Sequence, residues 1–122
     1  MGHLRVDRLT GQSAPLLAPD GRVLAARCHR AATPLARMAG LLFTADLQVE
    51  EALWIEPCSS VHAFGLRCAI GCAFLDGDGR VLRIVDPLPR WRAAGARGAR
   101  VVVECRAGVL AAVAPGDHLR RG

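Results

Sequence analysis

The sequence predicts a mainly β protein, a jelly-roll-like β sandwich or barrel with one or two short helices. Short β-compatible runs recur along the chain, and turn signals rich in Gly, Pro and Asp separate them at spacings of about ten residues. The regular strand–helix alternation of a parallel sheet is missing. The 122 residues are expected to form a single domain, residues 1–122, because a chain of this length buries roughly two-thirds of its unfolded surface.

The first thirty residues predict an edge strand followed by a hairpin. Residues 3–9 form the expected edge strand, which should break at the polar residues 10–13. The triplet Pro19-Asp20-Gly21 then predicts a turn, since glycine accepts the positive φ that many turns require. Residues 22–28 are β-compatible and complete the hairpin.

A change of period indicates one short helix in "ATPLARMAGLLF". Thr33 can cap the helix, and Pro34 suits its first position because the missing N–H has no intrahelical partner there. Leu35, Met38 and Leu42 then recur near one helical face.

The middle of the chain predicts further strands. Residues 51–56 form one that Pro57 ends, and β structure is favoured again in residues 61–64 and 68–76. Side chains alternate along a strand, so the last run has two faces: Cys68, Ile70, Cys72 and Phe74 on one, and Ala69, Gly71, Ala73 and Leu75 on the other. The following "DGDGR" predicts a tight turn into a partner strand, the strongest hairpin signal in the chain.

The last third predicts a loop, a buried strand and a short helix. Residues 87–100 are rich in Pro, Gly and Arg, which indicates a loop. The β-branched run that begins at Val101 is expected to be buried on both faces as far as Glu104. The tail, residues 107–119, predicts a short helix, a stop at Pro115-Gly116 and a final strand.

Composition favours a globular cytoplasmic protein. Hydrophobic residues make up 52% and charged residues 22%, and the net charge is +5. The basic residues are all arginine and are dispersed, and aromatic residues amount to only 4%, so nucleic-acid binding is not expected. No apolar run approaches the ~18 residues of a membrane span, and the N-terminus has no signal core, which predicts a cytoplasmic location and no membrane association.

The five cysteines are odd in number and lie among apolar neighbours, which argues against a disulfide framework. Cys58, His62, Cys68 and Cys72 contain the right ligand types for zinc, but their spacing does not match the C-x2-C pairs of structural sites. On a strand Cys68 and Cys72 would lie about 13 Å apart, too far to share one ion. We therefore expect no metal site and, since phosphate-loop and dinucleotide motifs are absent, no cofactor.

Four blocks in order, "RMAGLLF", "VHAFGLRCAIGCAFLDGDGRV", "VVVECRAGV" and "PGDHL", make residues from about 27 to 119 resemble the bacterial and archaeal domain of unknown function 192 family (DUF192). The resemblance implies a small jelly-roll-like β sandwich with short helices and implies no activity, because the family is uncharacterised. The matching positions are Arg37, Gly40, Leu41, Val61, His62, Phe64, Gly65, Arg67, Ile70, Phe74, Leu75, Asp76, Glu104, Ala107 and Gly108. Four positions depart from the family pattern: Leu42 and Leu66 stand where methionine is usual, Ala63 where threonine is usual, and Gly71 where aspartate is usual. The carboxylate of that aspartate could serve as a base, a metal ligand or an arginine partner.

The leading functional hypothesis is a non-enzymatic module that binds a small anionic ligand or a protein partner. Its expected surface comprises Arg37, Trp54, His62, Arg67 and Glu104. Arginine offers a planar fork suited to carboxylate or phosphate, and tryptophan could form a wall. The structural alternative is an arginine–Glu104 ion pair, with Trp54 in the core and His62 bonded to backbone.

Two other classes stay open. A cysteine–histidine hydrolase or transferase would use Cys58 as nucleophile and His62 as base, although no residue that would orient the histidine is recognisable. An adaptor would instead accept a partner strand at residues 3–9. Convergence of Cys58 and His62 in an open cleft would favour the enzyme, and their separation or burial would favour the module.

Overall fold

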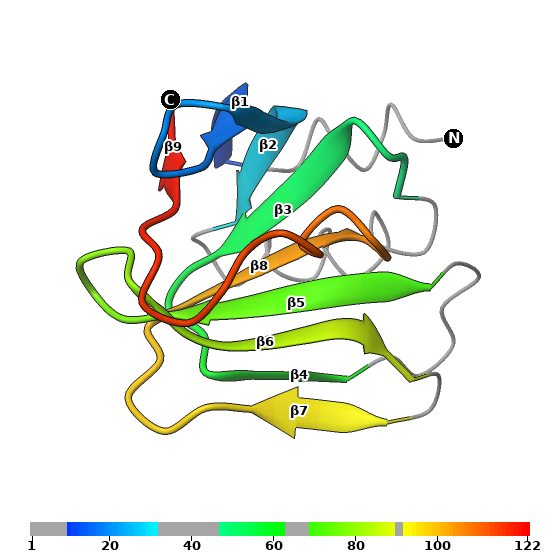
Figure 1. Ribbon diagram of the computed structural model, residues 1–122, viewed down its shortest axis with the longest axis vertical. Helices are drawn as coiled ribbons and strands as arrows, with labels where there is room; N and C mark the ends of the chain where they lie inside the picture. Colours follow the sequence, from blue (N-terminus) through cyan, green and yellow to red (C-terminus); the bar gives the residue numbers. More distant parts are fainter. Residues whose placement is uncertain (1–9, 32–46, 63–68, 90–91) are drawn as a thin grey trace.

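The computed structural model describes residues 10–31, 47–62, 69–89 and 92–122, and these residues form strands and turns without a helix. The mainly β class predicted from the sequence is confirmed. The strands are β1 (Thr10–Leu17), β2 (Val23–Ala31), β3 (Glu51–Ile55), β4 (Ser60–His62), β5 (Ile70–Leu75), β6 (Val81–Leu88), β7 (Ala93–Gly95), β8 (Val101–Arg106) and β9 (Arg120–Arg121), as labelled in Figure 1.

Seven strands form one sheet in the order β6-β5-β8-β3-β2-β1-β9, and β4 pairs with β7 in a small second sheet. The named pairs are antiparallel except β2 and β3, which run parallel. This parallel pair was not predicted from the sequence, and the jelly-roll arrangement is not confirmed. Residues 32–50, between β2 and β3, are long enough for the crossover connection that a parallel pair requires.

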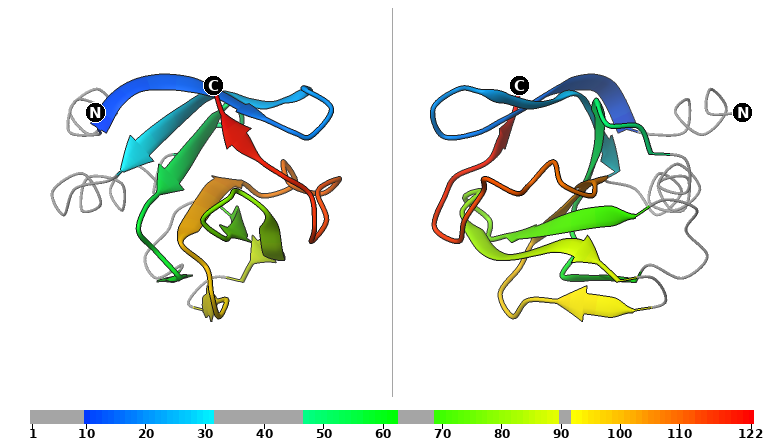
Figure 2. Two further views of the ribbon diagram at one scale, coloured as in Figure 1. Left: turned by 90° about the vertical axis from the view of Figure 1, so that its left-hand side faces the viewer. Right: turned by 45° about the vertical axis from the view of Figure 1, so that its right-hand side comes forward.

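The large sheet bends so that β1, β2 and β9 lie over β5 and β6 (Figure 2). The chain entering β9 also bonds to the β5–β6 turn and the start of β6. Val81 N–H donates to Asp117 O at 2.8 Å, and Leu119 N–H donates to Gly79 O at 3.0 Å. The two ends of the strand order are thereby brought together, which places the β5–β6 turn beside β9.

The core has two parts, one on each face of the large sheet. The inner cluster comprises Leu16, Ala25, Cys28, Ala52, Ala73, Leu75, Val81, Val101, Val103, Cys105, Leu110, Val113 and Leu119. The outer cluster comprises Ala31, Leu47, Leu53, Ile55, Ile70, Cys72, Phe74, Leu88, Ala99 and Val102, and residues of the β4–β7 sheet pack against it. Alternate residues of β5 divide between the clusters, which confirms the two predicted faces of this strand.

Two predicted features of the first half can be compared with the structure, and two cannot. The hairpin around Pro19-Asp20-Gly21 is confirmed, and Gly21 adopts a φ of 86° in its turn. The predicted break at residues 10–13 is wrong, because this stretch begins β1 and pairs with β2 through a register shift between Thr10 and Ala14. The expected edge strand at 3–9 and the expected helix at 33–42 lie outside the described residues.

The β5–β6 hairpin is confirmed, and one carboxylate organises its turn. Asp76 Oδ1 accepts the backbone N–H groups of Asp78 and Arg80, at 2.8 and 3.0 Å. These bonds hold the pKa of Asp76 below its ordinary value. Gly79 has a φ of 88°, a conformation that suits glycine. This turn forms one side of the cleft described below.

Two predictions for the second half are corrected. The expected loop at 87–100 contains β7, which pairs with β4 because its small residues allow close approach: a Cβ on Gly95 would lie 3.0 Å from Ser59 O. The tail helix is absent from the described residues 107–113, which form successive turns. The backbone N–H groups of Gly108 and Leu110 donate to the Asp86 carboxylate, at 2.9 and 3.0 Å, and Gly108 has a φ of 97°, which is incompatible with a right-handed helix at this residue. The final short strand, β9, is confirmed.

The position of Asp86 also explains why glycine fits at residue 71. A Cβ added to Gly71 would lie 2.5 Å from Asp86 Cγ, so the neighbouring strand β6 fills the space that a side chain at this position of β5 would enter. The carboxylate that the family resemblance places at residue 71 would occupy the same region. In this chain a carboxylate is present there, but β6 supplies it and two backbone donors bind it.

Candidate binding cleft

The structure describes the side chains of two residues of the predicted surface, Trp54 and Glu104, and it separates them. Trp54 pairs with Val103, and Leu53 pairs with Glu104, so Trp54 and Glu104 lie on opposite faces of the large sheet. Arg37, Arg67 and the side chain of His62 lie outside the described residues. Trp54 and Glu104 therefore do not share one surface, and the ligand-binding role of the five residues stays a prediction.

Glu104 is buried on the outer face of the sheet, with 4% of its surface exposed. Its strand neighbours on this face are Leu53 and Cys72. Desolvation, followed by the Glu104 charge, raises the pKa of the Cys72 thiol far above its usual range. Cys72 therefore stays protonated at neutral pH.

Cys58 is half-buried and packs against the outer cluster. Its thiol donates to the carbonyl oxygen of Ser60 at 3.1 Å. The buried thiols of Cys28 and Cys105 also have pKa values raised by desolvation, that of Cys28 to about 12. These environments are typical of thiols that act as small hydrophobic groups. The hypothesis of a Cys58–His62 enzyme stays a prediction, because it depends on the undescribed His62 side chain.

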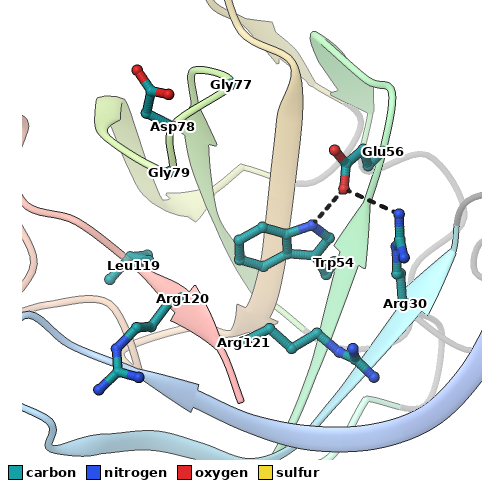
Figure 3. Close-up of a pocket in the computed structure, with 9 residues that line it drawn as sticks. All are labelled: Arg30, Trp54, Glu56, Gly77, Asp78, Gly79, Leu119, Arg120 and Arg121. Carbon is teal, nitrogen blue, oxygen red and sulfur yellow. Dashed lines mark hydrogen bonds and ion pairs between the residues drawn. The ribbon is translucent and has the colours of Figure 1, made fainter.

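The described residues contain an open cleft of about 330 Å³ between the β5–β6 turn and β9 (Figure 3). We call it the Trp54 cleft. Its lining residues come from β2, β3, the β5–β6 turn and the C-terminal segment: Arg30, Trp54, Glu56, Gly77, Asp78, Gly79, Leu119, Arg120 and Arg121. The register of the parallel β2–β3 pair places two of these residues side by side, because Arg30 and Trp54 are register partners.

Trp54, Glu56 and Arg30 form a connected group at one end of the cleft. The indole Nε1–H of Trp54 donates to Glu56 Oε1 at 3.0 Å. The same oxygen lies 3.7 Å from Arg30 Nη2. Figure 3 shows the Trp54 ring extending from this group toward the middle of the cleft. The ring is partly buried against the inner cluster, which fixes it as one wall.

The charges of the cleft have a recognisable arrangement. Asp78 lies on the side of the β5–β6 turn, and Arg120 and Arg121 project from β9 on the other side of the Trp54 ring (Figure 3). Arg121 is anchored, since its Nε–H donates to Cys28 O at 2.8 Å, whereas Arg120 is exposed. With Arg30, the lining contains three arginines and two acidic residues, so its net charge is positive.

Sequence analysis identified Trp54 but missed the other lining side chains. The alternation of Trp54 and Glu56 along one strand was a usable signal, because residues two apart share a face. No local signal linked them to Arg30 or to the arginines at the C-terminus. Those contacts depend on the parallel β2–β3 register and on the bend that brings β9 beside the β5–β6 turn.

A second polar pair, His29 and Glu51, lies apart from the cleft and makes stability depend on pH. His29 is 6% exposed, and its Nε2 lies 3.5 Å from Glu51 Oε2. Desolvation lowers the pKa of His29 below 6.5, against the opposing Glu51 charge. Protonation therefore favours the unfolded chain, and the free energy of unfolding should fall as the pH drops below about 6.5.

This expectation can be measured by urea denaturation at pH 7.5, 6.5 and 5.5. The slope attributable to one proton is at most about 1.4 kcal/mol per pH unit. His29→Gln should reduce the pH dependence, whereas His118→Gln, at an exposed position, should retain it. Equal slopes in the wild type and His29→Gln would contradict the assignment.

The fold and the cleft together define a small, mainly β protein whose curved sheet has an arginine-lined cleft. The family model of DUF192, described as "Uncharacterized ACR", matches residues 16–121. The chain belongs to this family, and the resemblance found in the sequence is confirmed.

Two solved structures share the fold. A protein of unknown function from Novosphingobium aromaticivorans is 23% identical with a TM-score of 0.72, covering 87% of this chain and 83% of that one. A protein described as a "putative transcription regulator" from Sinorhizobium meliloti is 18% identical with a TM-score of 0.74, covering 93% of this chain and 95% of that one. No curated protein matches the sequence. In the described part of the chain, no helix is long and apolar enough to cross a membrane.

Proposed function

We propose that this protein is a non-enzymatic module that binds a small anionic ligand in the Trp54 cleft. One observation carries the proposal: an open cleft of about 330 Å³ combines a fixed tryptophan wall with three arginines. Guanidinium groups bind carboxylates and phosphates through paired N–H donors, and an indole face accepts flat apolar groups. The cleft is of the size in which small molecules bind.

The lining residues favour binding over nucleophilic catalysis. None of the nine carries a thiol, a hydroxyl or an imidazole group. The lining has two carboxylates, a group that can act as a general base or nucleophile, and one of them, Glu56, accepts the Trp54 N–H. Cys58 lies outside the cleft, and its thiol bonds to a backbone carbonyl. A cytoplasmic location is part of the proposal and is supported by the free thiols of Cys28, Cys58, Cys72 and Cys105.

The proposal predicts that small anionic ligands raise the thermal stability of the protein. A ligand at one hundred times its Kd stabilises the folded state by about 2.7 kcal/mol, which corresponds to a melting-temperature increase of several degrees. The measurement is a thermal-shift screen of small carboxylates and phosphates beside their neutral amides and esters. Anions should raise the melting temperature, and their neutral counterparts should not.

The variant that tests the location of the ligand is Arg30→Gln/Arg120→Gln. Both side chains are largely exposed, so the double variant should keep the melting temperature of the free protein. It should lose at least five-fold in affinity for any anion that binds the cleft. A variant that retains full affinity for every binding anion would place the ligand elsewhere and overturn the proposal.

A further inference from the structure

We infer that Glu56 is a built-in competitor for the ligand, and that the Trp54 cleft selects a small planar monocarboxylate. This inference rests on the proposed function and deepens it. Its starting point is that two donors converge on one oxygen atom. Trp54 Nε1–H and Arg30 Nη2 both face Glu56 Oε1, at 3.0 and 3.7 Å. A carboxylate of the protein therefore occupies the place where donors are arranged for a carboxylate.

The contact between Glu56 and Arg30 is weak enough to exchange. A distance of 3.7 Å is longer than a good N–H···O hydrogen bond. The two side chains are 40% and 46% exposed, and exposed ion pairs contribute little to stability. Glu56 lies just beyond the end of β3, and its backbone N–H donates to Ala31 O at 3.2 Å, so the exchange involves the side chain alone. An incoming anion can therefore take Arg30 from Glu56.

Trp54 determines what the incoming group must supply. If Glu56 moves away, the partly buried indole N–H loses its acceptor, and an unsatisfied donor is costly. A ligand carboxylate replaces that acceptor with one oxygen and meets Arg30 with the other. The ligand carboxylate thus reproduces both contacts of Glu56. A neutral amide can accept the indole N–H, but it has no negative charge to pair with Arg30.

The acidic residues of the cleft favour a single negative charge. Asp78 lies on the side of the β5–β6 turn, and a displaced Glu56 remains near the cleft. Both carboxylates repel a dianion such as phosphate more strongly than a monoanion. The fixed Trp54 ring adds a flat apolar wall beside the donor pair. An aromatic or similarly planar monocarboxylate combines both requirements.

The inference is tested with benzoate, benzamide and inorganic phosphate as probes. Binding is followed through the indole N–H signal of Trp54 in nitrogen-15-labelled protein, with Trp91→Phe as the background so that one indole signal remains. Glu56→Gln should bind benzoate about three- to ten-fold more tightly than the background protein. Benzamide affinity should stay within two-fold. Benzoate should bind more tightly than phosphate in both proteins.

Asp78→Asn is the matched control, because Asp78 is the other acidic residue of the cleft lining. The hydrogen bond of Trp54 and the ion pair of Arg30 in this cleft are made with Glu56 and not with Asp78. Relative to the background protein, the benzoate affinity of Asp78→Asn should change by less than the benzoate affinity of Glu56→Gln. Unchanged or weaker benzoate binding in Glu56→Gln would overturn the competitor role. The proposed function would stand in that case if Arg30→Gln/Arg120→Gln still weakened anion binding at least five-fold. Absence of binding by all carboxylates and phosphates, in every variant, would overturn both.

Discussion

Replacing Gly71 by alanine should lower the free energy of unfolding by about 1–3 kcal/mol, the usual cost of forcing an extra group into a packed region. The added Cβ would lie 2.5 Å from Asp86 Cγ and 2.9 Å from Asp86 Cβ. Asp86 cannot yield freely, because its two carboxylate oxygens accept the N–H groups of Gly108 and Leu110. Either the strands separate or the turn after β8 loses its two bonds. Urea denaturation measures the loss.

Two variants isolate the Gly71–Asp86 contact. Gly77→Ala is the matched control, since a Cβ there meets only Arg100 Cγ, at 4.0 Å, and its effect on the free energy of unfolding should stay within about 1 kcal/mol. In an Asp86→Gly background the Gly71→Ala penalty should shrink to this control value, because the obstructing side chain is gone. An undiminished penalty in that background would show that Asp86 is not the obstacle.

Phe74→Ala should be the most damaging single substitution among those considered, with a loss of about 3–5 kcal/mol. Phe74 has no exposed surface and lies in the outer cluster on β5, an interior strand of the large sheet. Truncation leaves a cavity between the large sheet and the β4–β7 sheet, which packs against the same cluster. A domain of this size has only about 5–15 kcal/mol of stability in total, so much of its margin would be lost.

Leu82→Ala provides the comparison for Phe74. Leu82 is on the adjacent strand β6 but is 37% exposed, so its truncation should cost clearly less. Both variants are measured by equilibrium denaturation under the same conditions. Comparable losses for the two substitutions would contradict the assignment of Phe74 to a packed outer core.

The parts of the fold predicted from sequence are those with local causes. Alternation in β5 was sufficient to separate Phe74 from Leu75, and the turn chemistry of Asp76 and Gly79 located the β5–β6 hairpin. The parallel β2–β3 pair was missed, because strand direction depends on the crossover at residues 32–50 rather than on either strand. The predicted tail helix is absent because Gly108 adopts a φ of 97°, and the turn that it begins is bonded to Asp86, which is distant in sequence.

The candidate site was harder to predict than the fold. A shift of one residue in strand register reverses which face a side chain occupies, and sequence alone gave no register between β3 and β8. Trp54 and Glu104 were therefore grouped although they lie on opposite faces. Arg120 and Arg121 belong to a two-residue strand, which carries too little pattern to indicate its partner. Only the folded chain brings them beside Trp54.

The central claim is that an anionic ligand binds at Trp54 between the arginines of β2 and β9. The most direct test is the indole N–H signal of Trp54 during titration with benzoate, in the Trp91→Phe protein and in the same protein carrying Arg30→Gln/Arg120→Gln. We predict a saturable shift of this signal in the first protein and at least a five-fold weaker response in the second. A signal that stays unmoved while benzoate binding is detected by calorimetry would contradict the account.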